Sequence, residues 1–190
     1  MSNHDVNLTG VNRGETASYT RCSNFLGIER TFHNGTGAVP DVIRDLRPVK
    51  MQLVRNSSGG VLYPGQIVTY KTLLSGKEVT NPAAATSGRH DGVVDHYITG
   101  TVADGDCFWM VVDGPTKFLP DANAVTEFDT LVVSPNVAGA VKTQTAAPAD
   151  ATAAMLQVNG ALGRCEVASS AGSGTLSTTT GFYGFYRSKK

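Results

Sequence analysis

The sequence feature that most constrains the fold is the apolar run Cys107–Val112, which contains Trp109, the single tryptophan of the chain. The run is short, is rich in aromatic and β-branched side chains, and lies between the turn sequences Asp104-Gly105-Asp106 and Asp113-Gly114-Pro115. A buried helix would need roughly ten or more residues, so this pattern predicts a strand that is buried on both faces. A second such run covers Leu131–Val133. We therefore expect these two strands at the centre of a β domain.

Shorter apolar runs predict further strands along the chain. Val49–Val54 alternates apolar and polar side chains, as a strand with one buried face does. Val61–Tyr63, the turn Pro64-Gly65 and Ile67–Leu74 predict a hairpin. The remaining candidates are Phe25–Ile28, Val42–Leu46, Val93–Thr99 and a final pair, Leu162–Ala168 with Gly174–Thr180, while Ala146–Asn159 allows either a short helix or a low-complexity loop. Strands at this spacing, with little helix, predict an all-β fold, either a small β-barrel or a β-sandwich.

The N-terminal region differs from the rest of the chain. Residues 1–47 are polar, contain several arginines and break at Asn34-Gly35-Thr36-Gly37, whereas residues 48–190 contain the strong strand patterns. We therefore expect one β domain over 48–190. Residues 1–47 form either an extended N-terminal arm or the first strands of that domain. An extended arm would lie over the domain itself or over a neighbouring molecule.

The charge pattern bears on the class of partner. The chain holds 16 Lys and Arg against 16 Asp and Glu, so its formal net charge is zero. A neutral chain has no overall electrostatic attraction to nucleic acid or to an anionic membrane, and no apolar run approaches the roughly 18 residues of a membrane-spanning helix. The acids are nevertheless concentrated in residues 90–130, where Lys117 is the only Lys or Arg. This concentration indicates either loops that use aspartate to form turns or an acidic face that meets a basic partner.

The cysteine pattern predicts a reduced protein. Cys22, Cys107 and Cys165 are odd in number and far apart, and no C-x-x-C motif is present. This spacing argues against a disulfide framework and against a structural zinc site. Residues 1–30 also lack the apolar core of a secretory signal. We therefore expect synthesis in a cytoplasm.

One group of polar residues has the composition of a metal site. His90, Asp91, Asp95 and His96 combine imidazole and carboxylate, which bind zinc, manganese or iron. On a strand, however, the two aspartates would share one face and the two histidines the other, so the four side chains would not converge. No P-loop, EF-hand or G-x-S-x-G motif is complete in the chain. We predict no cofactor, no metal and no catalytic activity.

Two groups of residues are candidates for binding a partner. The C-terminal tail places four aromatic side chains within five residues. Such a tail suits stacking on sugars or bases, a closing strand, or a contact between subunits. The N-terminal arginines suit bidentate pairing with carboxylates on neighbouring molecules. The candidates are Arg13, Arg21, Arg30, Phe182, Tyr183, Phe185 and Tyr186.

Three sequence blocks, in this order, resemble the capsid decoration proteins, or cement proteins, of tailed bacteriophages. They read VRNSSGGVLYPGQIV at residues 54–68, GDCFWMVVDGP at 105–115 and ALGRCE at 161–166. The resemblance covers roughly residues 48–170. It lies in the spacing of glycines, turns and β runs, without a catalytic signature, and it does not include the first 47 residues.

The resemblance implies a structural virion protein on the capsid surface, made in the host cytoplasm, that binds and stabilises the lattice of the major capsid protein. Members of this family are small β domains that often form trimers. The implied partners are therefore the major capsid protein and further copies of this chain in a homotrimer, with no nucleic acid and no membrane. Two other functions stay open. One is a phage head-fibre or carbohydrate-binding β module, which would need exposed aromatic side chains along a groove. The other, with the least support, is a β-barrel hydrolase.

Overall fold

The computed structural model describes residues 11–33, 48–72, 76–81, 90–144, 161–165 and 182–187. Helix within these ranges is confined to α1 (Tyr19–Cys22) and the 3-10 helix η1 (Ser23–Phe25), which confirms the predicted all-β class. Neither helix is long and apolar enough to cross a membrane. The strands are β1 (Thr16–Ala17), β2 (Glu29–His33), β3 (Pro48–Asn56), β4 (Ile67–Tyr70), β5 (Glu78–Thr80), β6 (Gly92–Val94), β7 (Cys107–Phe118), β8 (Thr130–Val133), β9 (Val141–Thr143), β10 (Ala161–Cys165) and β11 (Phe182–Arg187).

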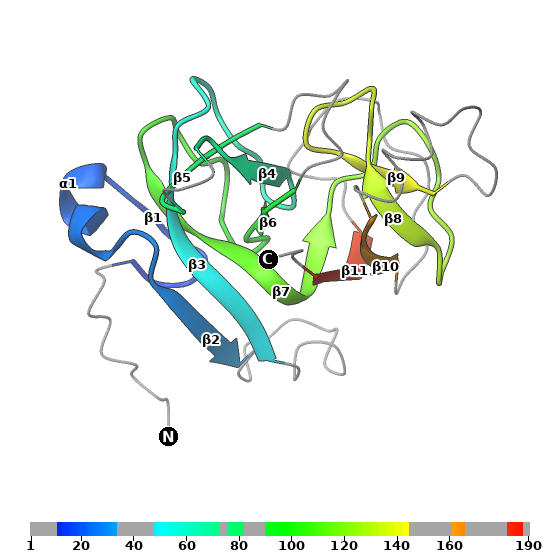
Figure 1. Ribbon diagram of the computed structural model, residues 1–190, viewed down its shortest axis with the longest axis horizontal. Coiled ribbons are helices and arrows are strands. Elements are labelled where there is room, and N and C mark those ends of the chain that lie inside the picture. The colour runs from blue at the N-terminus through cyan, green and yellow to red at the C-terminus, as the bar shows by residue number, and fades with distance from the viewer. Residues whose placement is uncertain are drawn as a thin grey trace.

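The sheet is organised around β7, which contains the apolar run Cys107–Val112. The first half of β7 pairs with β1, β3 and β6, and its second half pairs with β11. Figure 1 shows β7 between β3 and the N-terminal elements on one side of the molecule and β8 to β11 on the other. Of the two strands predicted to be central, the one through Trp109 joins the two halves of the fold, whereas Leu131–Val133 lies in β8, next to the last strand of the sheet.

Strand pairing closes into a ring on one side of β7. β3 pairs with both β5 and β7, β5 pairs with β4, and β4 connects through β6 back to β7. Beyond β7 the same sheet continues through β11, β10 and β8 to β9. The 11 strands thus form one sheet that is not a clear barrel.

Both faces of the run Cys107–Val112 are buried, as its sequence predicts. The smaller of two core clusters, which we call the ring core, contains Phe108, Met110 and Val112 together with residues of the ring strands and their loops. The larger cluster, which we call the outer core, contains the alternate residues of the run together with residues 11–26, β3 and β8 to β11. Every residue of the run is at most 3% exposed. Because side chains alternate along a strand, β7 contributes to both cores at once.

Residues 11–26 cover the outer core. Val11, Ala17, Cys22 and Leu26 are buried in that core, and β1 pairs with the start of β7. The Trp109 indole N–H donates a 2.8 Å hydrogen bond to the carbonyl oxygen of Val11. β2 then pairs along β3, as Figure 1 shows. Residues 11–33 therefore include strands that pack on the domain, while the division of the chain at residue 47 remains a prediction.

A disulfide joins Cys22 of α1 to Cys107 of β7, so the prediction of a chain without disulfides is wrong. The two cysteines are 85 positions apart in the sequence, and their Cα atoms lie 6.6 Å apart, within the usual range for a disulfide. Both are fully buried in the outer core. Spacing alone carries no signal for this pairing, because the packing of residues 11–26 against β7 is what brings the two thiols together. Cys165 is also buried and is not part of a disulfide.

The strand through Trp109 is longer than predicted. The turn sequence Asp113-Gly114-Pro115 does not end it, since β7 continues to Phe118 and pairs with β11 over residues 113–118. Gly114 has a φ of 117°, and a Cβ there would lie 2.9 Å from the carbonyl oxygen of Pro48. The register between β7 and β3 shifts just before the glycine, between Val111 and Asp113. Gly114 therefore lets the continuing strand pass close to the start of β3 instead of turning back.

Other strand predictions are confirmed or corrected by the pairing. Val49–Val54 and Leu131–Val133 are strands, within β3 and β8. The predicted hairpin is wrong, because Leu62 bridges to Val102 and β4 pairs with β5 and β6. The predicted strand Val93–Thr99 ends at Val94. β10 pairs with β11 and β8, whereas Gly174–Thr180, Val42–Leu46 and Ala146–Asn159 lie outside the described residues.

Candidate interaction surface

Arg13, one of the predicted partner-binding residues, makes its contacts within the domain. Its Nε lies 3.4 Å from Oδ2 of Asp95, whose side chain is fully buried. Its guanidinium carbon lies 4.3 Å from the centre of the Tyr97 ring, and the Arg13 side chain is only 13% exposed. Burial raises the pKa of Asp95, and the positive charge of Arg13 opposes that rise. These contacts of Arg13 therefore stabilise the packing of residues 11–17 on the domain.

His96 is the second titratable group of this buried cluster. Burial, with smaller contributions from the positive charges of Arg13 and Lys117, lowers the pKa of His96 from 6.5 to about 3. The Nδ1 atom lies 3.8 Å from Oδ1 of Asp95, and the imidazole ring packs against Tyr97 with 4.3 Å between ring centres. The imidazole is therefore neutral at pH 7.

The other two residues of the metal-like group have separate partners. The Nδ1 atom of His90 lies 3.0 Å from the hydroxyl oxygen of Tyr186 on β11. Oδ2 of Asp91 accepts a 2.8 Å hydrogen bond from the backbone N–H of Tyr70 on β4. Across the part of the chain that the structure describes, no three His, Cys, Asp or Glu side chains form a group able to hold a metal ion. These side chains hold strands and loops together.

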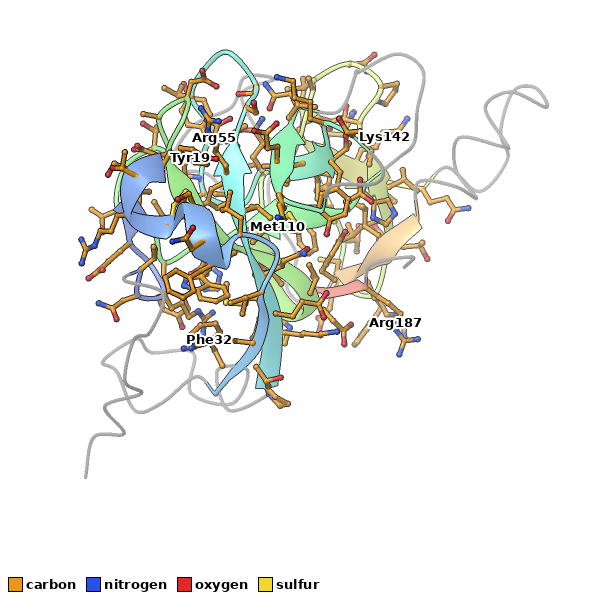
Figure 2. All side chains as sticks on the ribbon, turned by 60° about the vertical axis from the view of Figure 1, so that its left-hand side comes forward. Tyr19, Phe32, Arg55, Met110, Lys142 and Arg187 are labelled. Carbon is orange, nitrogen blue, oxygen red and sulfur yellow. A yellow bond between two sulfur atoms is a disulfide. The ribbon has the colours of Figure 1, made fainter. Side chains whose placement is uncertain are left out.

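Arg21 and Arg30, the other predicted arginines, lie on the N-terminal elements. Arg21 is exposed in α1, and Arg30 is half-buried on β2. Tyr19, also on α1, is 44% exposed, and the guanidinium carbon of Arg55 lies 4.4 Å from the centre of its ring. Figure 2 shows these two side chains beside each other. The end of β3 and α1 thus present a surface that is partly aromatic and partly charged.

The aromatic tail forms β11, which pairs with both β7 and β10. Tyr186 is fully buried in the outer core, and its ring centre lies 6.4 Å from that of Phe118. The tail is therefore a closing strand, which was one of its three interpretations, and the Tyr186 side chain does not lie on the surface. For Phe182, Tyr183 and Phe185 the structure describes the backbone only, so a role for these three in binding a partner remains a prediction.

Several aspartates of residues 90–130 stabilise turns and loops. Oδ1 of Asp104 accepts a 2.9 Å hydrogen bond from the N–H of Gly59. Asp121 is buried and accepts hydrogen bonds of 2.8 Å from the N–H of Asn123 and 2.9 Å from the hydroxyl of Ser134. These contacts agree with the interpretation of the acidic region as loops in which aspartate caps backbone groups.

One exposed turn, at residues 126–129, is not predicted by the sequence patterns. Phe128 is 62% exposed, more than the other large apolar side chains found exposed in the described residues, and it is the one non-glycine residue among them with a positive φ, 71°. The N–H of Asp129 donates a 3.2 Å hydrogen bond to the carbonyl oxygen of Thr126. Phe128 therefore occupies the third position of a four-residue turn, where a positive φ usually requires glycine or asparagine.

Hydrogen bonds within the turn and from β10 hold it in place. Oδ2 of Asp129 accepts a 2.9 Å hydrogen bond from the N–H of Thr126. The N–H of Phe128 donates to the carbonyl oxygen of Cys165 at 3.0 Å. Nε of Arg164 donates to the carbonyl oxygen of Phe128 at 3.1 Å, and its guanidinium carbon lies 5.1 Å from the ring centre. We call this exposed pair, Phe128 and Arg164, the Phe128 knob.

A surface depression lies beside the knob. Its volume is about 290 Å³, and the described residues that line it are Asn123, Lys142, Thr143 and Gln144. It adjoins the turn because the hydroxyl of Thr143 donates a 3.0 Å hydrogen bond to Oδ2 of Asp129. Figure 2 shows Lys142 across the molecule from Tyr19 and Arg55. A sugar-binding groove would need aromatic rings along it, and the four lining residues supply none.

Comparison with known proteins adds little to this description. The sequence matches no protein-family model, and no curated protein is similar to it at a significant level. Among solved structures, one match is a chain described as the head fiber gp8.5 N base in bacteriophage phi29. The two chains are 13% identical, and the match covers 74% of this chain and 96% of that chain with a TM-score of 0.43. A TM-score of this size establishes neither a common fold nor a common function.

Proposed function

We propose that the chain is a structural protein of a tailed-bacteriophage head, where it decorates and stabilises the capsid by binding the lattice of the major capsid protein. The proposal is carried by the three sequence blocks that resemble cement proteins, and their positions in the fold support it. The end of β3, in the first block, pairs with β7, in the second, at Phe108 and Cys107. β10, in the third block, connects to β7 through β11. The three blocks thus belong to one continuous stretch of the sheet around β7.

The chemistry of the described surface supports a protein partner. The buried charged and aromatic side chains make their contacts within the domain, as Arg13 does with Asp95. The exposed aromatic rings are stacked with arginine, in the pair of Tyr19 with Arg55 and in the Phe128 knob. Aromatic residues and arginine are enriched where proteins contact each other. The protein would then act on the capsid surface of the virion by binding alone, without enzymatic activity.

We further propose that the protein binds the capsid as a homotrimer, as the resemblance implies. Light scattering of the purified protein, alone and after release from heads, measures the number of copies. A mass three times that of the 19.9 kDa chain is the expected result. A monomer in both states would contradict the trimer, while the capsid-binding role would still stand.

Co-sedimentation tests the proposed function. Heads of the phage that encodes the chain, prepared without this protein, are mixed with the purified full-length protein and pelleted. We expect saturable binding at a fixed ratio to the major capsid protein, and greater resistance of the decorated heads to heat. Heads that already carry the protein are the control and should bind no more. Protein that stays in the supernatant at every concentration would contradict the proposal.

A further inference from the structure

We propose that the Phe128 knob is an anchor that binds the protein to the surface of the head. In this contact the Phe128 ring enters an apolar pocket of the partner protein, and Arg164 pairs with a carboxylate beside that pocket. The inference rests on the proposed function, because it names the contact through which that function would act.

The backbone at Phe128 is the first observation. A φ of 71° brings the Cβ of an L-residue close to its own backbone, so a bulky residue is strained there, whereas glycine or asparagine is not. The hydrogen bonds with Thr126, Cys165 and Arg164 force the turn into this shape. Strained residues held in this way are concentrated at functional sites. We therefore infer that a favourable contact of the Phe128 side chain offsets the energy cost of this backbone conformation.

Burial within the fold does not supply that contact. The Phe128 ring is 62% exposed, whereas Phe108 and Trp109 are at most 1% exposed. The guanidinium carbon of Arg164 lies 5.1 Å from the ring centre, and most of the Phe128 side chain still faces water. Burying the ring against a partner would remove this apolar surface from water, so an anchor role accounts for a phenylalanine at a position that suits glycine.

Arg164 defines the charge of the partner. It is exposed and uses Nε to hold the turn. No carboxylate of the described residues lies within ion-pair distance of it. A guanidinium has five N–H donors and pairs with carboxylates in a bidentate manner. A complementary partner surface therefore has an apolar pocket with an Asp or Glu at its edge, and aromatic and arginine anchors of this kind dominate the energy of many interfaces.

Three single substitutions in the full-length chain test the anchor. Phe128→Asn removes the ring but tolerates the positive φ, so the turn and its backbone hydrogen bonds are kept. Arg164→Gln removes the charge but retains a side-chain donor. Val61→Ser is the matched control, because Val61 is also exposed, at 46%, and has no positive φ. Affinity for heads that lack the protein and the melting temperature are measured for each variant.

We expect Phe128→Asn to lower the affinity for heads by about 30-fold or more, as loss of an interface anchor does, with a melting temperature that is unchanged or higher. Arg164→Gln should lower the affinity by about tenfold and reduce its dependence on salt, because an ion pair is screened by salt. Val61→Ser should change neither the affinity nor the melting temperature.

The possible failures are distinguishable. If the wild-type protein does not bind heads, the proposed function and the anchor both fall. If the wild type binds and Phe128→Asn binds equally well, the anchor alone is overturned. A loss of binding by Phe128→Asn that is matched by a fall in melting temperature would make the ring a structural group and overturn the anchor. So would a smaller oligomer of this variant in light scattering, since the ring would then contact a second copy of the chain.

Discussion

The two faces of β7 are buried by different means. The face with Phe108 and Met110 lies against the ring core, which is enclosed by strands that pair with one another and with β7. The face with Cys107 and Trp109 lies against the outer core, and part of its cover is residues 11–26, which precede β7 by about 85 positions. The first face is closed by a circuit of strand pairs. The second needs a distant segment to be brought onto it.

The difference shows how a short segment is kept on a core. β1 contains two residues, so residues 11–26 gain few sheet hydrogen bonds against the conformational entropy lost on ordering. Contacts of individual side chains hold them as well, among them the disulfide of Cys22, the hydrogen bond from Trp109 and the ion pair of Arg13 with Asp95. Stability on this face is therefore concentrated in a few residues, which makes it sensitive to substitution, reduction and pH.

The largest expected effect comes from Trp109→Ala. This change removes a fully buried ring and the hydrogen bond to Val11, so we expect the free energy of unfolding to fall by about 3–5 kcal/mol. Denaturant unfolding measures the loss. Phe108→Ala on the other face is the matched variant. It should cost a similar amount, yet only Trp109→Ala should speed proteolytic cleavage within residues 11–26. A loss below about 1 kcal/mol for Trp109→Ala would contradict its place in the core.

Breaking the disulfide should have the next largest effect. Cys22→Ser removes a cross-link that closes a loop of 85 positions, and we expect a loss of about 2–4 kcal/mol. A reducing agent should lower the stability of the wild type by a similar amount and leave Cys22→Ser unchanged. Cys165→Ala, measured under the same conditions, should remain sensitive to the reducing agent. Equal stability of the oxidised and reduced wild type would show that the disulfide does not stabilise the folded protein.

Asp95→Asn tests the ion pair of the N-terminal segment. The substitution leaves the charge of Arg13 largely buried without its partner, and we expect a loss of about 1–3 kcal/mol, less than for a fully buried pair because Arg13 keeps some exposure to water. The double variant Arg13→Gln, Asp95→Asn should lose less than the sum of the two single variants. Strictly additive losses in this cycle would mean that the two side chains do not interact.

The smallest effect is a dependence of stability on pH. Because the pKa of His96 is about 3 in the folded protein and 6.5 ordinarily, the unfolded chain binds a proton below pH 6.5 and the folded protein does not until about pH 3. Stability from His96 is thus present above pH 6.5 and is lost as pH falls through that window, by about 1 kcal/mol between about pH 7 and about pH 5.5. Urea unfolding at these two pH values measures the loss.

Asp95 acts in the opposite direction. Its raised pKa means that the folded protein binds this proton at a higher pH than the unfolded chain, whose ordinary value is 3.8, so acidification above pH 3.8 favours the folded state at this group. His96→Gln should therefore remove the loss of stability between about pH 7 and about pH 5.5, whereas Asp95→Asn should remove the opposing gain of stability on acidification toward pH 3.8. A His96→Gln protein with the wild-type pH dependence would contradict the assignment to His96.

Local sequence patterns predicted the strands better than their connections. The runs around Val49–Val54, Cys107–Val112 and Leu131–Val133 became strands because a short, apolar and β-branched stretch has few other ways to bury its side chains. Partner strands were predicted less well, because pairing depends on residues far apart in the sequence. The pairing of β4 with β5 and β6, and the bridge from Leu62 to Val102, replaced the expected hairpin for that reason.

The candidate site was mostly hidden from the sequence. Arg13 and Tyr186 were singled out as candidates for binding a partner protein, but within the fold each contacts a buried residue, Asp95 and His90 respectively. Phe128 was missed because phenylalanine is not a turn-forming residue type, and its positive φ comes from hydrogen bonds that β10 makes with the turn. A pattern rule that uses only neighbouring residues has no means of detecting such a contact.

The sequence by itself determined the all-β class and the double-sided burial of the strand through Trp109, since both follow from local hydrophobic patterning over a few residues. The tertiary structure alone decided the ring of strands, the disulfide of Cys22 with Cys107, and the strained turn at Phe128. Each of these depends on contacts between segments that are distant along the chain. Such contacts depend on how all segments pack together, which the residues of any one segment do not encode.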